Sequence, residues 1–348
     1  MTNETSRGVL TEPVDTHAPP AATPTNRGIA SGSTRVRRDR AAALALPAIL
    51  VGLCLLFSLL RPDTFATLDN VRAIVLTQSV LAVLSIAVLL PLVIGEFDLS
   101  VGANLGLGAV MVPGLISKQG LGLVPAILCG VAICTLVGAI NGFMVAKVKI
   151  AAFIATLGMA TIISGVVLWY TDSTAIYSGL PPALTDIARK SVVGVPLPGI
   201  YLVVIATAVW YVLEHTPVGR YLYALGGSRD AARLAGLGVD RLVLSTFAAT
   251  GFLCGIGGVL QAASLGVGNP NVGPPLLLPA FAAAFLGATA IKVGVFNVWG
   301  TLVAVFTLAV GITGLSLLGV PTFIEPLFNG IALIVAVTAT RYLRRDVS

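Results

Sequence analysis

The stretch Asp98-Leu99-Ser100-Val101-Gly102 lies between two long runs of residues that carry no charge. The run before it, Ala73–Gly95, and the run from Leu99 to Ser117 each approach the roughly 20 residues that an α-helix needs to cross a bilayer. A carboxylate in such surroundings is costly unless it lies at a helix end, faces a partner or lines a hydrated path. The sequence therefore indicates a membrane protein, with transport as the first function to consider.

Few charged residues occur in the rest of the chain as well. They make up 10% of it and hydrophobic residues 56%, whereas about a quarter of a soluble domain is charged. We therefore expect an all-α, polytopic integral membrane protein with about ten transmembrane helices, one short span of which could be re-entrant. The remaining uncharged stretches are Ala41–Leu60, Gln119–Ala146, Ile150–Thr171, Ser191–Leu213, Leu242–Ile291 (two spans joined by a turn at Gly268–Pro275), Val293–Leu318 and Phe323–Thr340.

The positions of Lys and Arg predict the orientation in the membrane. If successive spans alternate across the bilayer, most of the 21 Lys and Arg residues fall on the side that holds both ends of the chain. Because these residues concentrate in cytoplasmic loops, we expect the N- and C-termini in the cytoplasm. The net charge of +6 thus reflects topology, and we expect no nucleic-acid partner.

Residues 1–40 differ in composition from the rest of the chain. They are polar, rich in Pro, Thr and Ala, and lack hydrophobic periodicity, so we expect a disordered cytoplasmic tail. The arginines at its end and the apolar run that follows are typical of an uncleaved signal anchor. Residues 41–345 then form one transmembrane domain, in which residues 214–241 are the longest cytoplasmic loop.

Side chains suited to covalent or metal chemistry are scarce. The two histidines, His17 and His215, are far apart in the sequence, and the four cysteines fall inside expected spans, where small apolar packing is their ordinary role. No Gly-Lys pair occurs, so the sequence has no phosphate-binding P-loop. We expect no catalytic residue, no metal site and no cofactor, and the energy for transport comes from a partner or from a solute gradient.

Two interpretations of the segment around Asp98 stay open. Its side chain, or that of Ser100, can cap the following helix by accepting hydrogen bonds from the first amides. Alternatively, the segment is a glycine-flanked break that lines a translocation path or forms a gate. The candidate residues for the path or gate are Glu96, Asp98, Ser100 and Gly102.

The loop 214–241 carries a second candidate site. Gly226-Gly227-Ser228 is typical of a loop that starts a helix, and we expect a short helix from Asp230 to Ala235 that ends at Gly236. Asp230 and Arg233 lie one turn apart and can pair on the helix surface. This loop is either an ordinary solvated loop or a docking helix that another protein contacts closely through its small residues.

Several motifs together make the chain resemble the permease subunits of ribose-type (monosaccharide) ABC importers, a family that also includes autoinducer-2 permeases. The resemblance runs from about residue 41 to the end, on the motifs Asp98-Leu99-Ser100-Val101-Gly102, Ala152-Phe153-Ile154-Ala155-Thr156-Leu157, Gly219-Arg220-Tyr221-Leu222-Tyr223-Ala224-Leu225-Gly226-Gly227, Ala231-Ala232-Arg233-Leu234-x-Gly236 and Gly300-Thr301-Leu302. It implies a second permease copy or paralogue, two cytoplasmic ABC ATPase subunits and an extracytoplasmic sugar-binding protein as partners, in addition to membrane lipid.

The resemblance also implies a role for the short helix. Asp230-Ala231-Ala232-x-x-x-Gly236 is similar to the Glu-Ala-Ala-x-x-x-Gly loop by which ABC importer permeases engage the ATPase, with Asp in place of Glu. Glu96 and Phe97 replace the small residues usual before Asp98, and Leu278–Ala283 lacks the usual acidic residue. The residues expected to couple to the ATPase are Gly226, Gly227, Asp230, Ala231, Ala232, Arg233 and Gly236.

The function expected from the sequence is therefore that of a non-enzymatic permease in the plasma (inner) membrane. It would import a sugar or sugar-like solute by alternating access, with ATP hydrolysed by a separate subunit. The alternative is an ATPase-independent secondary carrier or channel, in which Glu96, Asp98 and Glu325 would carry the coupling.

Overall fold

The computed structural model describes the backbone of residues 31–345 and the side chains of residues 43–339. The chain divides into two units, Met1–Arg38 and Asp39–Ser348, and the second contains all the features discussed below. Disorder is expected for residues 1–40: residues 1–30 lie outside the described residues, whereas residues 31–40 form the start of a helix. Helix α1 begins at Ser31, ahead of the expected start of the first span at Ala41.

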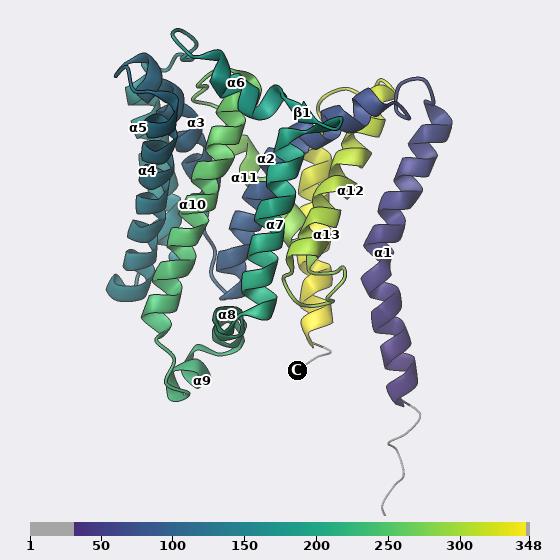
Figure 1. The fold of residues 1–348 in the computed structure, drawn as a ribbon. Coiled ribbons are helices and arrows are strands. Elements are labelled where there is room, and N and C mark those ends of the chain that lie inside the picture. Colours follow the sequence, from purple (N-terminus) through teal and green to yellow (C-terminus); the bar gives the residue numbers. More distant parts are fainter. Residues whose placement is uncertain (1–30, 346–348) are drawn as a thin grey trace, which may run out of the picture. The chain divides into compact units, whose positions relative to one another are not determined.

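The described part of the chain is almost entirely helical, as the sequence predicts (Figure 1). Seven helices are long and apolar enough to cross a membrane, and three shorter apolar helices accompany them. Each predicted span contains one of these helices, and Leu242–Ile291 contains two. They are α1 (Ser31–Leu60), α2 (Leu68–Val93), α3 (Val101–Ser117), α4 (Leu123–Phe143), α5 (Ala152–Thr171), α7 (Leu197–His215), α10 (Val239–Leu265), α11 (Leu277–Gly287), α12 (Val298–Leu317) and α13 (Ile324–Arg345).

Shorter elements lie in the connections between these helices. One turn of π-helix, η1 (Met144–Val148), extends α4, and a 3₁₀ turn, η2 (Pro274–Leu276), precedes α11. The span expected from Ser191 starts later, at Leu197, because the residues before it form a small hairpin that turns at Gly194 with φ of +80°. The other short elements are α6 (Pro182–Arg189), β1 (Ser191–Val192), β2 (Val195–Pro196), α8 (Pro217–Gly227) and α9 (Arg229–Leu234).

Glycines bring α3, α4 and α10 unusually close together. A Cβ on Gly138 of α4 would lie 2.3 Å from the carbonyl oxygen of Phe247 on α10, and one on Gly258 of α10 would lie 2.6 Å from that of Leu105 on α3. Gly251 likewise faces Gly138 across the α4–α10 contact. The glycines of α10 therefore serve packing within the chain, as expected for small residues between membrane helices.

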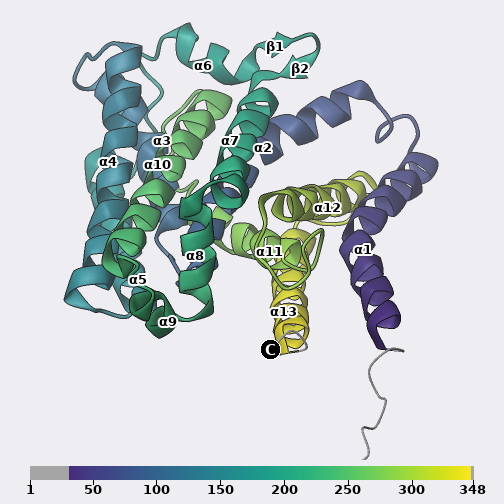
Figure 2. The same cartoon turned by 60° about the horizontal axis from the view of Figure 1, so that its bottom comes forward.

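The connections gather at two opposite ends of the helices. Figure 1 shows α6 and the hairpin at one end, and α8 and α9 at the other, where the described part of α13 also finishes; Figure 2 brings this second end forward. Lys147 and Lys149 belong to the second end, where both pair with Asp240 at the start of α10. This is the end for which the sequence predicts a cytoplasmic location.

Candidate functional site

The chain between α2 and α3 forms a helix break. The main chain of Gly95, with φ of +80°, turns the chain out of α2, and the N–H groups of Gly95 and Glu96 donate to carbonyls of the last turn, at Leu92 and Pro91. A glycine tolerates this left-handed conformation without strain. Helix α3 does not begin until Val101, so residues 94–100 are irregular backbone, of which Ile94, Asp98 and Ser100 are buried while Gly95 and Phe97 are exposed.

Asp98 stabilises this break from within. Its side chain is buried, and its Oδ1 accepts hydrogen bonds from the backbone N–H of Ser100 at 2.9 Å and from the Ser100 hydroxyl at 2.6 Å. Ser100 Oγ in turn accepts a bond from Nδ2 of Asn141 on α4, at 2.8 Å. Ser100, the N-cap residue of α3, makes no side-chain capping bond, and the two bonds described for Asp98 go to Ser100 itself. The carboxylate therefore fixes a turn ahead of the helix and does not cap the first amides of α3 as the capping interpretation expected.

Helix α5 also holds the break. The backbone N–H of Leu99 donates to the hydroxyl of Thr156 at 3.0 Å, and this hydroxyl donates to the carbonyl of Ala152 at 2.7 Å. Sequence reasoning did not place Asn141 or Thr156 in the site, although an amide inside an apolar span was a visible signal. Both side chains are fully buried, and buried polar groups are expected to be hydrogen-bonded.

A second break precedes α11, and it meets the first one. The sequence predicts a turn between two spans at Gly268–Pro275, and the structure places this connecting segment along α3. Gly268 pairs with Ile176 through two backbone hydrogen bonds, and Gly273 lies against Gly102 and Gly106 of α3. The predicted connection between two spans is therefore present, and the structure adds that Gly268 and Gly273 let it pack against neighbouring segments, which local turn chemistry does not reveal.

The starts of α3 and α11 therefore lie next to each other. A Cβ on Gly102 would lie 3.2 Å from the Cβ of Leu277, the first residue of α11. Helix α11 has 11 residues, too few to cross a bilayer alone. Discontinuous helices whose ends meet are the elements that form solute sites in many transporters, and irregular backbone at this depth is tolerated where protein encloses it.

The short helix expected in the loop 214–241 is confirmed as α9. The hydroxyl of Ser228 caps it by accepting a bond from the N–H of Ala231 at 3.2 Å. At its other end Gly236 takes a φ of +79°, and the N–H of Leu237 donates to the carbonyl of Ala232. Local capping chemistry thus determines where this helix begins and ends.

Helix α9 turns one face outward and one face inward. Ala232 is buried, whereas the side chain of Asp230 is 91% exposed and pairs at 3.6 Å with Arg233, as the spacing predicts. Leu234 is also 91% exposed. Gly227 has open space around it, whereas Gly226 packs against the last turn of α2. The outward face combines small, apolar and charged groups, a surface suited to contact with another protein.

One ion pair joins the predicted path residue Glu96 to α9, through Arg229, which was not among the coupling residues expected from the sequence. Glu96, in the break after α2, pairs with Arg229, the first residue of α9. Burial raises the pKa of Glu96, and the neighbouring Arg229 guanidinium opposes this shift. Asp98 and Ser100 lie further along the break, and Gly102 lies in the first turn of α3. None of the bonds described for these three residues reaches α9.

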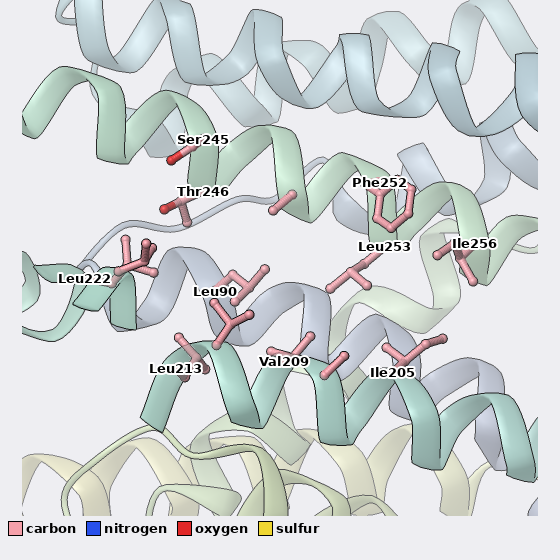
Figure 3. A pocket seen from close by; sticks show the side chains of 14 residues that line it. Leu90, Ile205, Val209, Leu213, Leu222, Ser245, Thr246, Phe252, Leu253 and Ile256 are labelled. Carbon is pink, nitrogen blue, oxygen red and sulfur yellow. The ribbon is translucent and has the colours of Figure 1, made fainter. Parts of the chain in front are cut away.

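A cavity of about 370 Å³ lies between α2, α7, α8 and α10, and no residue of the two breaks lines it. Figure 3 shows Leu90, Val209 and Leu253 among the side chains that surround it, with the hydroxyls of Ser245 and Thr246 at one end. Nearly all of its lining is apolar, whereas a polar solute needs several hydrogen-bonding partners. The cavity is therefore a poor candidate for a sugar site.

Among the described residues, no three His, Cys, Asp or Glu side chains gather in a group that could hold a metal.

Comparisons with known proteins cover nearly the whole helical region. Residues 70–337 match the family model described as branched-chain amino acid transport system / permease component. The chain is 33% identical over 297 residues to a ribose import permease protein of Haemophilus influenzae, covering 84% of this chain and 91% of the relative. It is 29% identical to a D-allose transport system permease protein of Escherichia coli (85% and 91% covered) and 30% identical to an L-arabinose ABC transporter permease protein of Azospirillum brasilense (83% and 84%). No solved structure matches the chain significantly.

Proposed function

The chain belongs to the family of branched-chain amino acid transport system permease components, and we propose that it imports a monosaccharide across the cytoplasmic membrane. The observation that carries this proposal is similarity along more than four-fifths of the chain to permeases named for ribose, D-allose and L-arabinose. The protein is a multi-pass, non-enzymatic membrane component of an ABC importer.

ATP hydrolysis would come from a separate ABC ATPase that docks on α9. This assignment is supported by three features of α9: its capped start, the exposed Leu234 and the Asp230–Arg233 pair. Together they present a defined surface at the end of the bundle where Lys147 and Lys149 also lie. This is the end that the sequence predicts to be cytoplasmic, together with both termini. A sugar-binding protein would deliver the solute to the opposite face, and a second permease copy or a paralogue would complete the transmembrane unit.

The gate of the path would be the pair of helix breaks. Gly102 and Gly273 allow the starts of α3 and α11 to touch, and Asp98 and Ser100 fix the geometry of the first break. Two helix starts that meet by backbone contact can separate without unfolding a full helix, which suits alternating access. Glu96, at the edge of the break, links it to α9.

The carrier alternative finds no support in the placement of its three carboxylates. Glu96 is paired with Arg229, Asp98 is engaged with Ser100, and Glu325 is exposed in the first turn of α13. Coupling to an ion gradient needs a carboxylate that gains and loses its ion along the path, and these three are distributed over different environments.

Reconstitution tests the proposed function directly. The chain is placed in liposomes with its ATPase and its binding protein, and uptake of ribose, allose, arabinose and fructose is measured with and without ATP. We expect uptake of at least one of these sugars, and only when all three components and ATP are present. Uptake that persists without the ATPase would contradict the proposal, and a control with a hydrolysis-deficient ATPase separates ATP binding from turnover.

A further inference from the structure

Two adjacent residues in the first break, Glu96 and Phe97, connect to different parts of the protein. The carboxylate of Glu96 pairs with Arg229 at the start of α9. The ring of Phe97 stacks on Phe281 and Phe285 of α11, with centroid distances of 6.2 and 6.3 Å and interplanar angles of 21° and 26°. One dipeptide therefore links the surface helix α9 to the half-length helix α11.

A second connection runs from α8 to the same rings. The hydroxyl of Tyr223 donates a hydrogen bond to the carbonyl oxygen of Phe296 at 2.8 Å, and the Phe296 ring packs edge-on against Phe285 with centroids 5.4 Å apart. Burial, reinforced by the charge of Glu214, raises the pKa of Tyr223 to about 12, so its hydroxyl stays a donor. We call the rings of Phe97, Phe281, Phe285 and Phe296 the aromatic cluster.

Helices α8 and α9 are also fixed to the end of α2. A Cβ on Gly226 would lie 2.0 Å from the carbonyl oxygen of Val93, so the last turn of α8 lies directly on the backbone of α2. Just before α8, Glu214 in the last turn of α7 pairs with Lys292 in the connection between α11 and α12, at 2.7 Å. Displacement of α8 and α9 would thus act on the break and on α11 together, because interfaces of packed elements shift as units.

We propose that Phe97, with Phe281 and Phe285, forms the gate of the path at the α9 end, and that the Glu96–Arg229 pair transmits the movement of α9 to this gate. Phe97 supports the assignment because it remains 43% exposed although two rings stack on it. A stack of apolar rings blocks a hydrated sugar until the rings separate, since the sugar would lose hydrogen bonds to water without replacement. The inference rests on the proposed function, which supplies the movement and the solute.

Charge reversal tests the transmitting pair. Glu96→Arg, Arg229→Glu and the double variant are reconstituted with the ATPase and the binding protein, and sugar uptake is measured per ATP hydrolysed. We expect each single reversal to lower this ratio about tenfold and the double variant to recover most of it, as a direct pair should in a double-mutant cycle. Lys190→Glu, which reverses a charge in the exposed Lys190–Asp186 pair of α6, is the matched control and leaves the ratio unchanged.

A second measurement tests the gate without ATP. The assembled complex is placed in vesicles loaded with labelled sugar, and leakage is followed for the wild type, Phe97→Leu and Phe97→Ala. We expect leakage to increase from the wild type to Leu and further to Ala. Cross-linking a Phe97→Cys, Phe281→Cys variant in a background without the four native cysteines should stop uptake, and a reductant should restore it.

The outcomes separate the two proposals. If the wild type shows no ATP-driven uptake of any sugar, the proposed function fails, and the leakage series still decides whether Phe97 seals a path. If the wild type transports and both Phe97→Ala and the single charge reversals behave like it, the gate and its link to α9 are wrong while the proposed function stands. Recovery by the double variant shows that the two residues act as a pair. The fall in uptake per ATP hydrolysed in a variant that stays folded is the readout that a merely structural pair would not produce.

Discussion

Gly102 of α3 and Gly273 ahead of α11 touch backbone to backbone. A Cβ on Gly102 would lie 2.9 Å from the carbonyl oxygen of Gly273, and a Cβ on Gly273 would lie 2.3 Å from that of Gly102. Both distances are too short for any side chain, so only two glycines permit this contact. It joins two breaks that are far apart in the sequence, and it is the point at which α3 and α11 start side by side.

Enlarging Gly273 should therefore impair transport. In Gly273→Ala the new methyl group cannot be accommodated beside the Gly102 carbonyl, and overpacking of this kind costs about 1–3 kcal/mol. We expect a lower thermal midpoint in detergent and loss of sugar uptake. Gly158→Ala in α5 is the matched control, because nothing lies within 4 Å of the position where its Cβ would be; it should keep wild-type uptake and midpoint.

Substitutions at Asp98 distinguish the shape of its side chain from its charge. Asp98→Asn keeps an oxygen that can accept the two bonds from Ser100, so we expect a folded protein that retains most of its uptake. Asp98→Ala leaves the N–H of Ser100 without its partner, which costs about 1–3 kcal/mol when the group is buried. Thermal midpoint and uptake are measured for both variants. If Asn abolishes uptake in a stable protein, the carboxylate charge itself acts in the path.

The exposed face of α9 should be needed for binding the ATPase and dispensable for folding. Leu234 is 91% exposed, so Leu234→Glu removes no internal packing but places a charge where a partner would bury an apolar side chain. We expect an unchanged thermal midpoint of the permease and loss of the ATPase on co-purification. Val193→Glu is the control, since Val193 is 98% exposed at the opposite end. Retention of the ATPase by Leu234→Glu would contradict docking through α9.

Acidity on the α9 side should weaken coupling through Glu96. Burial holds the pKa of Glu96 above its ordinary value, with Arg229 opposing the shift. Because the folded-state pKa is raised, protonation of Glu96 adds no instability as the pH falls, but it removes the charge that pairs with Arg229. We expect uptake per ATP hydrolysed to fall on acidification. Protonation of Glu96 should not lower the thermal midpoint of the protein. In Glu96→Gln the ratio should be low at neutral pH already and should change less with pH.

The sequence alone was sufficient for the helices and for the local chemistry of α9. Charged residues bracket the apolar spans, and a membrane requires that each such span satisfy its own backbone hydrogen bonds, so each predicted span corresponds to a helix although several of the helix ends differ. Ser228 and Gly236 likewise set the limits of α9 through bonds to residues within one turn. The site residues Asp98 and Ser100 could be named because a polar group between apolar spans is conspicuous, and their mutual bonds are local.

Contacts between distant segments were decided only by the tertiary structure. The pairing of Glu96 with Arg229, the stacking of Phe97 on α11 and the insertion of Gly273 beside Gly102 each join residues more than a hundred positions apart. Such contacts depend on which helix faces pack together, and charge and hydropathy patterns give the length of a membrane helix but not the neighbour it meets. Between apolar helices in lipid, close packing and a few polar contacts determine which helices associate. These contacts form only when the helices assemble.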